Sequence, residues 1–236
     1  MNIWLMIELG NTAAAVARMI NSLIIQGIAM FASAEVRWFW RSRCPQPVRD
    51  WFFTSGLPPG GGQPRIDRYL PQPRATDLGL KERGDMPGFE VKGLVSTRIN
   101  PELAGIASHL ELWCKWSCTV PGLKPTDEAT ITKTRWLRQF DTSQSVRTEI
   151  PLDANEKPKP GYVLPAQGCN VELTEVSMLG RSGVWWTLGF EAFGDFDTVP
   201  TNLTRAVLPD SVVLAGLVSS GALLSYPAWL SARLTD

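Results

Sequence analysis

Apolar and polar residues alternate along much of the chain with the two-residue period of β-strands. Short segments rich in Gly and Pro separate the alternating runs, and helical patterns are confined to about 47–53, 101–107 and the region after Thr201. This order predicts an α+β protein that is mainly antiparallel β, either a closed barrel or a highly curved sheet, with a few flanking helices. The eight runs are 34–40, 65–70, 78–83, 89–95, 109–118, 130–140, 170–178 and 184–193.

The sequence between and around these runs predicts one domain. It contains no internal repeat and no long linker. We therefore expect a single domain over 31–236, including a C-terminal helical region at about 201–236, preceded by an apolar segment at 1–30 that is helical or lies outside the core. The expected loops are 57–64, 71–77, 84–88 (a hairpin connection), 121–127 and 153–161.

Both ends of the chain are apolar. The first 30 residues contain Glu8 and Arg18 and lack a basic start, so they are a poor signal peptide. The uncharged run 211–232 is long enough to consider as a membrane span, but it contains glycines and a proline. We expect a packed helix over 212–224, on the barrel exterior or its end, and no membrane.

Charged residues gather on one face of the predicted strands, because successive side chains of a strand point to opposite sides. The opposite faces carry large apolar residues such as Trp38, Leu188 and Phe190. Either the charged faces line a wet interior while helices cover the apolar faces, or the apolar faces fill the barrel and the charges meet solvent. The pattern leaves both open. The charged face contains Glu35, Arg37, Lys81, Arg83, Glu90, Lys92, Glu111, Lys115, Lys133, Arg135, Glu172 and Glu191.

Composition narrows the possible partners. With 23 basic and 23 acidic residues the formal net charge is zero, which argues against binding of a nucleic acid duplex or an anionic membrane by bulk charge. Four Cys in 236 residues make no disulfide framework, and Cys114 and Cys118 have no matching second pair for zinc. We expect reduced thiols and a cytoplasmic location. The single His109 removes most imidazole-based metal sites.

Charged residues occur in a characteristic order between about 31 and 195. The order is Ser33-Ala-Glu35-Val-Arg37, Asp67 and Tyr69, the pairs Lys81/Arg83 and Glu90/Lys92, Lys133/Arg135 with Arg138, and the late Glu172 and Glu191. This order resembles the CYTH superfamily, also called triphosphate tunnel metalloenzymes, which includes class IV adenylate cyclases, thiamine triphosphatases, and inorganic or RNA triphosphatases. The resemblance implies an eight-stranded antiparallel tunnel lined by charged side chains.

The resemblance also implies roles for these residues. Mg²⁺ or Mn²⁺ would be held by Glu35, Glu172 and Glu191, and Glu35 and Lys92 would be the catalytic residues. The family signature Glu-x-Glu-x-Lys is altered here, since Ser33 replaces the first acid and Arg37 replaces the Lys. One carboxylate fewer holds a divalent ion less well, so we expect weak catalysis that Ser33→Glu raises. The expected triphosphate-binding residues are Arg37, Lys81, Arg83, Lys115, Lys133, Arg135 and Arg138.

Three functions remain open on the sequence alone. The first is binding and metal-dependent hydrolysis of a phosphate-rich small molecule, either a triphosphate-containing compound or inorganic polyphosphate. The second is non-catalytic binding of such a ligand on the same fold. The third is an unrelated β-barrel with an apolar interior that binds an apolar ligand or a protein. Trp113, which shares a strand face with Glu111 and Lys115, is a further candidate for ligand contact.

Overall fold

The structure is a computed structural model that describes residues 30–71, 74–83, 88–119 and 127–235. The expected N-terminal segment 1–30 lies outside the described residues, except for Met30. Most of the predicted hairpin at 84–88 and of the predicted loop at 121–127 lies outside them as well.

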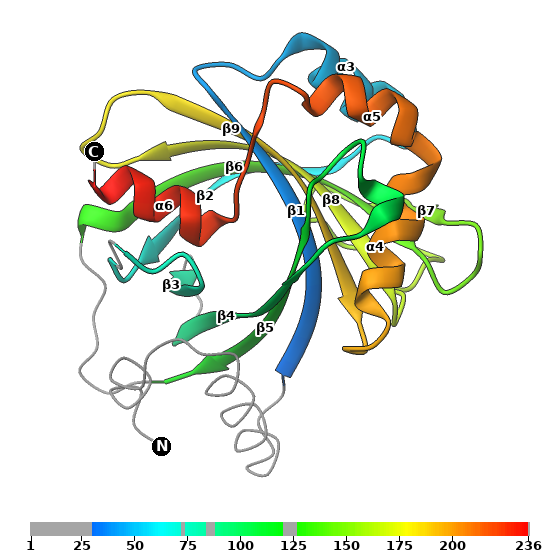
Figure 1. Ribbon diagram of the computed structural model, residues 1–236, viewed down its shortest axis with the longest axis horizontal. Coiled ribbons are helices and arrows are strands. Elements are labelled where there is room, and N and C mark those ends of the chain that lie inside the picture. The colour runs from blue at the N-terminus through cyan, green and yellow to red at the C-terminus, as the bar shows by residue number, and fades with distance from the viewer. Residues whose placement is uncertain (1–29, 72–73, 84–87, 120–126, 236) are drawn as a thin grey trace.

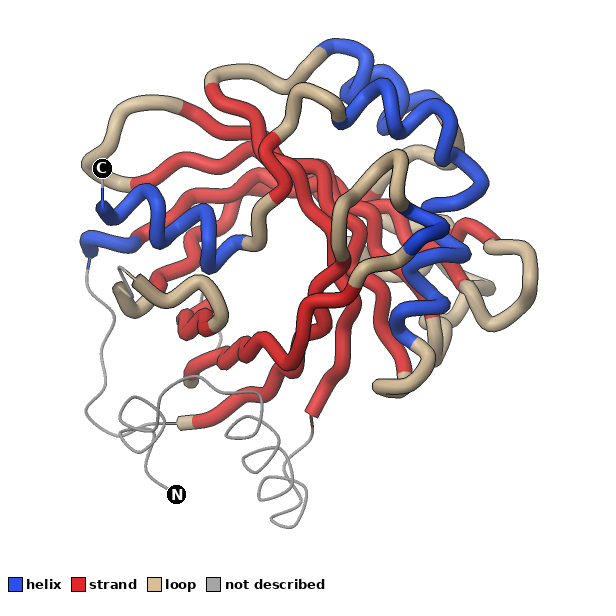
Figure 2. The backbone as a smooth tube through the Cα atoms, in the orientation of Figure 1, coloured by secondary structure: helices blue, strands red, loops and turns tan. Residues whose placement is uncertain are grey.

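Eight antiparallel strands close into a barrel, because β9 pairs back to β1. The order around the barrel is β1-β5-β4-β3-β2-β6-β8-β9, and Figures 1 and 2 show the closed ring of strands. The predicted eight-stranded antiparallel barrel is therefore confirmed. The strands are β1 (Met30–Arg41), β2 (Gly60–Tyr69), β3 (Leu78–Arg83), β4 (Phe89–Arg98), β5 (Leu110–Cys118), β6 (Thr130–Asp141), β8 (Gly168–Met178) and β9 (Val184–Gly194).

Two short strands and one strand start differ from the prediction. β7 (Thr148–Ile150) pairs with β6, and β10 (Ala222–Leu223) pairs with β1. β2 begins at Gly60, inside the segment that we expected to be a loop. Its Gly61 and Gly62 have φ values of +93° and +90°, and the pairing with β6 shifts register between Gly61 and Pro64. Glycine adopts this backbone at little cost, so a Gly-rich run here forms an irregular strand instead of a loop.

Three of the helices lie on one side of the barrel and a fourth crosses one end of it (Figure 1). The side helices are α3 (Gln46–Thr54), α4 (Val199–Val207) and α5 (Ser211–Val218), and the end helix is α6 (Tyr226–Thr235). The helix predicted at 101–107 is only the short 3-10 turn η1 (Pro101–Leu103). Among the described residues, no helix combines the length and the apolar character needed to cross a membrane.

The helix predicted over 212–224 was wrong in its second half. α5 ends at Val218, and β10 then pairs with Trp38 and Phe39 of β1. Gly221 forms the turn between them, where a Cβ atom would lie 2.8 Å from Trp38 Cβ and from the Trp40 ring. This close approach of the backbone to β1 requires glycine and brings the chain into the sheet.

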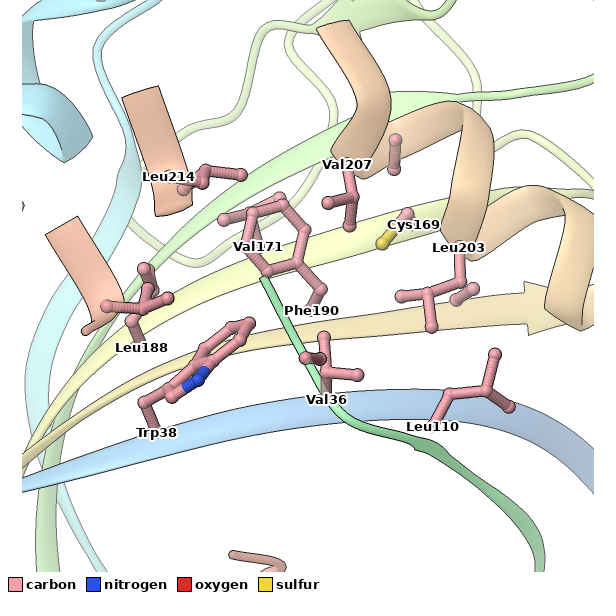
Figure 3. Packing of buried hydrophobic residues seen from close by; sticks show 14 of the residues in the cluster. Val36, Trp38, Leu110, Cys169, Val171, Leu188, Phe190, Leu203, Val207 and Leu214 are labelled. Carbon is pink, nitrogen blue, oxygen red and sulfur yellow. The ribbon is translucent and has the colours of Figure 1, made fainter. Parts of the chain in front are cut away.

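The main apolar core lies outside the barrel, between its outer face and the side helices (Figure 3). Val36 of β1 and Phe190 of β9 pack in one cluster with Leu203 of α4 and Leu214 of α5, and all four are buried. Burial of each such side chain stabilises the fold by about 1.5–3 kcal/mol. Because the apolar faces are covered in this way, the charged faces turn inward. This arrangement decides between the two alternatives that the sequence left open, because charged side chains line a cavity inside the barrel.

A second apolar cluster closes one end of the barrel interior. Phe39, Tyr69, Ile131 and Val176 come from four strands and pack against Trp229 of α6. Tyr69 shares its strand face with the charged Asp67, so the interior changes from charged to apolar along its length. The charged part of the interior is therefore bounded at one end by α6.

Candidate functional site

Eight basic side chains from six strands surround one cavity of about 390 Å³ in the barrel, which we call the barrel cavity. Pockets of about 300–1,000 Å³ are typical of small-molecule sites. The acidic residues that line it are Glu90, Glu172 and Glu191. The basic residues are Arg37, Arg65, Lys81, Arg83, Lys92, Lys115, Lys133 and Arg135.

The first group of charges surrounds Glu35, which lies directly behind the cavity lining. Lys92 Nζ is 2.6 Å from Oε2, Lys115 Nζ is 3.1 Å from Oε1, and the Ser33 hydroxyl donates to Oε1 at 2.7 Å. Lys115 also contacts Glu191 at 2.5 Å. Burial by itself would raise the pKa of Glu35, but Lys115 and Lys92 outweigh it and hold that pKa well below its usual range. Glu35 is thus a fixed anion that positions two lysines.

The second group is built around Glu172. Its two oxygens accept hydrogen bonds from Arg37 Nη2 at 2.7 Å and Arg135 Nη1 at 2.6 Å. Arg135 Nε also donates to Glu156, from the loop after β7, at 2.8 Å. Gly189 opposite has no Cβ, and one placed there would lie 2.4 Å from the Arg37 guanidinium carbon. The absence of that side chain makes the room that the guanidinium occupies beside Glu172.

The third group is centred on Asp67, whose side chain is fully buried. Lys133 Nζ lies 3.0 Å, Arg65 Nε 3.3 Å and Lys81 Nζ 3.5 Å from its carboxylate oxygens. Lys133 also donates to the Tyr69 hydroxyl at 2.8 Å. Burial lowers the pKa of Lys133 to about 7, although Asp67 acts to raise it. Lys133 therefore changes charge near neutral pH, which an exposed lysine does not.

The cavity has a surplus of positive charge. Six carboxylates pair with its eight basic side chains, which leaves a formal excess of two positive charges among the described residues when Lys133 is charged and of one when it is neutral. The six are Glu35, Asp67, Glu90, Glu156, Glu172 and Glu191. Inside the barrel, where the effective dielectric constant is lower than in bulk water, this surplus attracts anions more strongly than it would at the surface.

The expected metal ligands do not form a metal site in this arrangement. Among the described residues, no group of three or more His, Cys, Asp or Glu side chains is placed to hold an ion. Glu111 and Glu191 lie opposite Glu35 on the two neighbouring strands, but ammonium groups and the Ser33 hydroxyl already contact both oxygens of Glu35. Glu172 is held in the same way between two guanidinium groups. The residues therefore do not fit the Mg²⁺ or Mn²⁺ that the resemblance implies.

Arg138 does not lie in the barrel cavity, contrary to the expectation. It is five residues after Lys133, and an odd number of residues along a strand reaches the opposite face. Its guanidinium binds Glu149 at 2.7 and 2.8 Å and donates to the Ser55 hydroxyl at 2.6 Å. Arg138 thus ties the outer face of β6 to β7 and to the end of α3.

Trp113 occupies a core position inside the barrel and is not among the residues that line the cavity. Its indole donates to Glu111 at 3.1 Å, and Lys92 Nζ lies 4.5 Å from the centre of its ring. Burial raises the pKa of Glu111. Trp113 thus packs against Lys92, one of the two lysines that contact Glu35 in the first group of charges.

The other predicted residues do come together. Arg37, Lys81, Arg83, Lys92 and Lys115 line the barrel cavity, as do Lys133, Arg135, Glu172 and Glu191. The sequence reasoning missed Arg65, although it lies two residues before Asp67 on the same strand face. It also missed Tyr226 and Glu156, which no strand alternation could reveal, because α6 brings in Tyr226 and a loop brings in Glu156.

Comparisons with known proteins add little to this geometry. No protein-family model matches the chain, and no curated protein matches it. Among solved structures, the chain is similar to the S. pombe Pct1 RNA triphosphatase in complex with the Spt5 CTD. The identity is 10%, the match covers 95% of this chain and 90% of that chain, and the TM-score is 0.34. The fold and the interior together define a closed antiparallel barrel with a charged cavity.

Proposed function

We propose that the barrel cavity binds a small polyanion of the triphosphate or inorganic polyphosphate class. The observation that carries this proposal is the convergence of eight basic side chains, from six strands, on one cavity in the barrel. Transfer of a polyphosphate from water into a protein cavity has a large desolvation cost, which is compensated only where several fixed cations contact the ligand. Basic groups on opposite walls can contact successive phosphates of an extended ligand.

The carboxylates within the cavity favour a ligand with several charges. Every lining cation already contacts a carboxylate, as Arg37 and Arg135 contact Glu172. A ligand has to share or replace these ion pairs. A ligand with a single negative charge gains too little interaction energy to compensate for the ion pairs that it breaks. Arginine binds phosphate through two parallel hydrogen bonds, and lysine acts as a compact charge, so both types suit a phosphate chain.

Hydrolysis is not part of the proposal. The metal-dependent reaction needs carboxylates free to hold an ion, and those of Glu35 and Glu172 are held in ion pairs. Where the family signature has its first acid, Ser33 donates a hydrogen bond to Glu35. The second function expected from the sequence, binding without catalysis, is therefore the one that this geometry supports best.

Calorimetric titration with tripolyphosphate at low salt tests the proposal. We expect one ligand per chain, with an affinity that falls as salt increases. Lys81→Gln removes one charge-assisted contact, of about 1.5–3 kcal/mol, and should weaken binding tenfold or more. Arg68→Gln is the matched control, since Arg68 lies on the next strand and is not among the cavity-lining residues. Equal losses in both variants, or no binding by the wild-type protein, would contradict the proposal.

A phosphate-release assay with tripolyphosphate and Mg²⁺ or Mn²⁺ tests the catalytic alternative separately. We expect no metal-dependent turnover by the wild-type protein. Ser33→Glu places a second carboxylate beside Glu35 and is the variant in which such turnover should first appear. Turnover by the wild-type protein that disappears in Glu35→Gln would restore the hydrolase function.

A further inference from the structure

Lys133 of β6 lies where the barrel cavity meets the end of the barrel that α6 closes. Its side chain is 3% exposed and belongs to the lining of the cavity. Nζ lies 3.9 Å from the centre of the Tyr226 ring of α6 and donates to the Tyr69 hydroxyl at 2.8 Å. Val176, opposite Lys133 on β8, is buried in the apolar cluster at this end. The amine of Lys133 is therefore at the boundary between the apolar end of the barrel and its charged cavity.

The ion pairs around Lys133 do not require its positive charge. Three cations surround the carboxylate of Asp67, with Lys133 Nζ at 3.0 Å, Arg65 Nε at 3.3 Å and Lys81 Nζ at 3.5 Å. Asp67 is thus still paired with Arg65 and Lys81 when Lys133 is neutral. Burial is the largest influence on Lys133, and with the two neighbouring cations it lowers the pKa to about 7 against the opposing effect of Asp67. A large fraction of Lys133 is therefore a neutral amine at neutral pH.

Lys92 and Lys115, which also line the cavity, have closer carboxylate partners. Lys115 Nζ lies 2.5 Å from Glu191 and 3.1 Å from Glu35. Burial acts to lower the pKa of Lys115, but these two carboxylates raise it. Burial lowers the pKa of Lys92, whose Nζ lies 2.6 Å from Glu35. Of these three lysines, Lys133 has the longest ion-pair distance, and its carboxylate keeps two other cations, so Lys133 loses its proton most readily.

We infer that Lys133 is a nucleophile that forms an imine with a small aldehyde carrying a phosphate group. A neutral lysine amine attacks a carbonyl carbon, and a lysine is activated for this reaction by desolvation or by a neighbouring cation. Both conditions are met at Lys133. The inference rests on the proposed function, because the cations of the barrel cavity bind the phosphate group of the aldehyde.

The reaction balances with water as its only other product. A bond forms between Lys133 Nζ and the carbonyl carbon, and the carbonyl oxygen leaves as water with the two hydrogens of the neutral amine. Uptake of one proton from solvent then gives the protonated imine. This imine has the same positive charge as the lysine ammonium group, so it can pair with Asp67, which lies 3.0 Å from Nζ.

Reaction of the wild-type protein with pyridoxal 5′-phosphate at pH 7 tests the inference. Borohydride reduction fixes the imine, and peptide mapping by mass spectrometry locates it. At this pH about half of Lys133 is neutral, against less than about 0.1% of a lysine with an ordinary pKa. We expect Lys133 to be labelled at least about tenfold faster than the exposed Lys157, and tripolyphosphate to slow this labelling. Pyridoxal, which lacks the phosphate group, should label Lys133 at least about tenfold more slowly.

Two variants provide the comparison. Lys133→Arg keeps a positive charge beside Asp67 and removes the nucleophile, so the fast labelling should disappear. Lys157→Arg, in the exposed loop after β7, is the matched control and should leave the fast labelling unchanged. If Lys133→Arg does not fold, the peptide map of the wild-type protein still decides.

The inference is overturned if Lys133 of the wild-type protein reacts no faster than Lys157. It is also overturned if pyridoxal labels Lys133 as fast as pyridoxal 5′-phosphate does, because the cavity then does not select a phosphate. In both cases the proposed function stands if calorimetry shows that tripolyphosphate binds. Absence of tripolyphosphate binding in that titration contradicts the proposed function instead, so the two failures are distinguishable.

Discussion

Replacement of Glu172 by Gln should make the protein less stable and yet a tighter binder of polyanions. Glu172 accepts hydrogen bonds at 2.7 Å from Arg37 and at 2.6 Å from Arg135, and only 7% of its side chain is exposed. Glutamine keeps one carbonyl acceptor, so one guanidinium faces an amide N–H group instead of an acceptor. Both guanidinium groups also lose their shared counter-charge.

The magnitude follows from these contacts. One partner of a buried ion pair is removed, which costs about 3–5 kcal/mol of unfolding free energy. For a domain of this size that corresponds to a fall in Tm of about 6–20 °C. A phosphate oxygen can replace the lost carboxylate, so tripolyphosphate affinity should rise about tenfold, equivalent to about 1.4 kcal/mol.

Thermal unfolding with and without tripolyphosphate measures both effects. The ligand should raise the Tm of Glu172→Gln by more than it raises that of the wild-type protein, because ligand-induced stabilisation follows affinity. The control is Glu175→Gln on the same strand, three residues further on and so on the outer face, which should change neither quantity. The reasoning is refuted if Glu172→Gln is as stable as the wild-type protein, or if the ligand stabilises both proteins equally.

Two further predictions concern pH and the outer face of the barrel. Burial lowers the pKa of Lys133 to about 7, so Lys133 is charged below pH 7 and neutral above it. The affinity for tripolyphosphate, measured by calorimetry, should therefore fall about tenfold as pH rises from 6 to 8. In Lys133→Met, the only pH dependence that should remain is the one due to titration of the ligand itself. Arg138→Met should lower the free energy of unfolding by about 3–5 kcal/mol, since it removes the cation that pairs with Glu149 and leaves that carboxylate only the hydrogen bond from the Leu57 N–H among the described residues. Urea unfolding should show this loss of stability, and calorimetric titration should show an unchanged affinity for tripolyphosphate. A weakened affinity would show that Arg138 contributes to the binding site.

Strand alternation was sufficient to predict the eight strands of the barrel and most of the charged residues that meet inside it. It worked because each strand has one apolar and one charged face, so an even spacing such as that of Lys133 and Arg135 places both side chains on one side. The same rule applied to Arg138 would have excluded it from the cavity. Its inclusion came from the resemblance and not from the spacing.

The features that the sequence did not predict depend mostly on contacts between distant parts of the chain. Which face turns inward is decided by α4 and α5, which bury the apolar faces of β1, β8 and β9. The contributions of Tyr226 and Glu156 depend on where a helix and a loop pack, which no local pattern encodes. The irregular start of β2 was missed because Gly61 and Gly62 have the composition of a loop.

The failure of the expected metal site has a similar cause. The glutamates are on the predicted strands, but their ion pairs form between strands that are distant in the sequence. Lys115 of β5, for example, bridges Glu35 of the neighbouring β1 and Glu191 of β9, the next strand beyond it. The sequence predicts which carboxylates point into the same interior, but it does not predict which Lys and Arg side chains form ion pairs with them.

The structure of the protein crystallised with tripolyphosphate at low salt tests the central claim most directly. We predict phosphates within the barrel cavity, in contact with Arg37, Lys81 and Lys133, and Glu172 displaced from at least one of its two arginines. Tripolyphosphate bound only on the outer surface, with the barrel cavity and its ion pairs unchanged, would contradict the account.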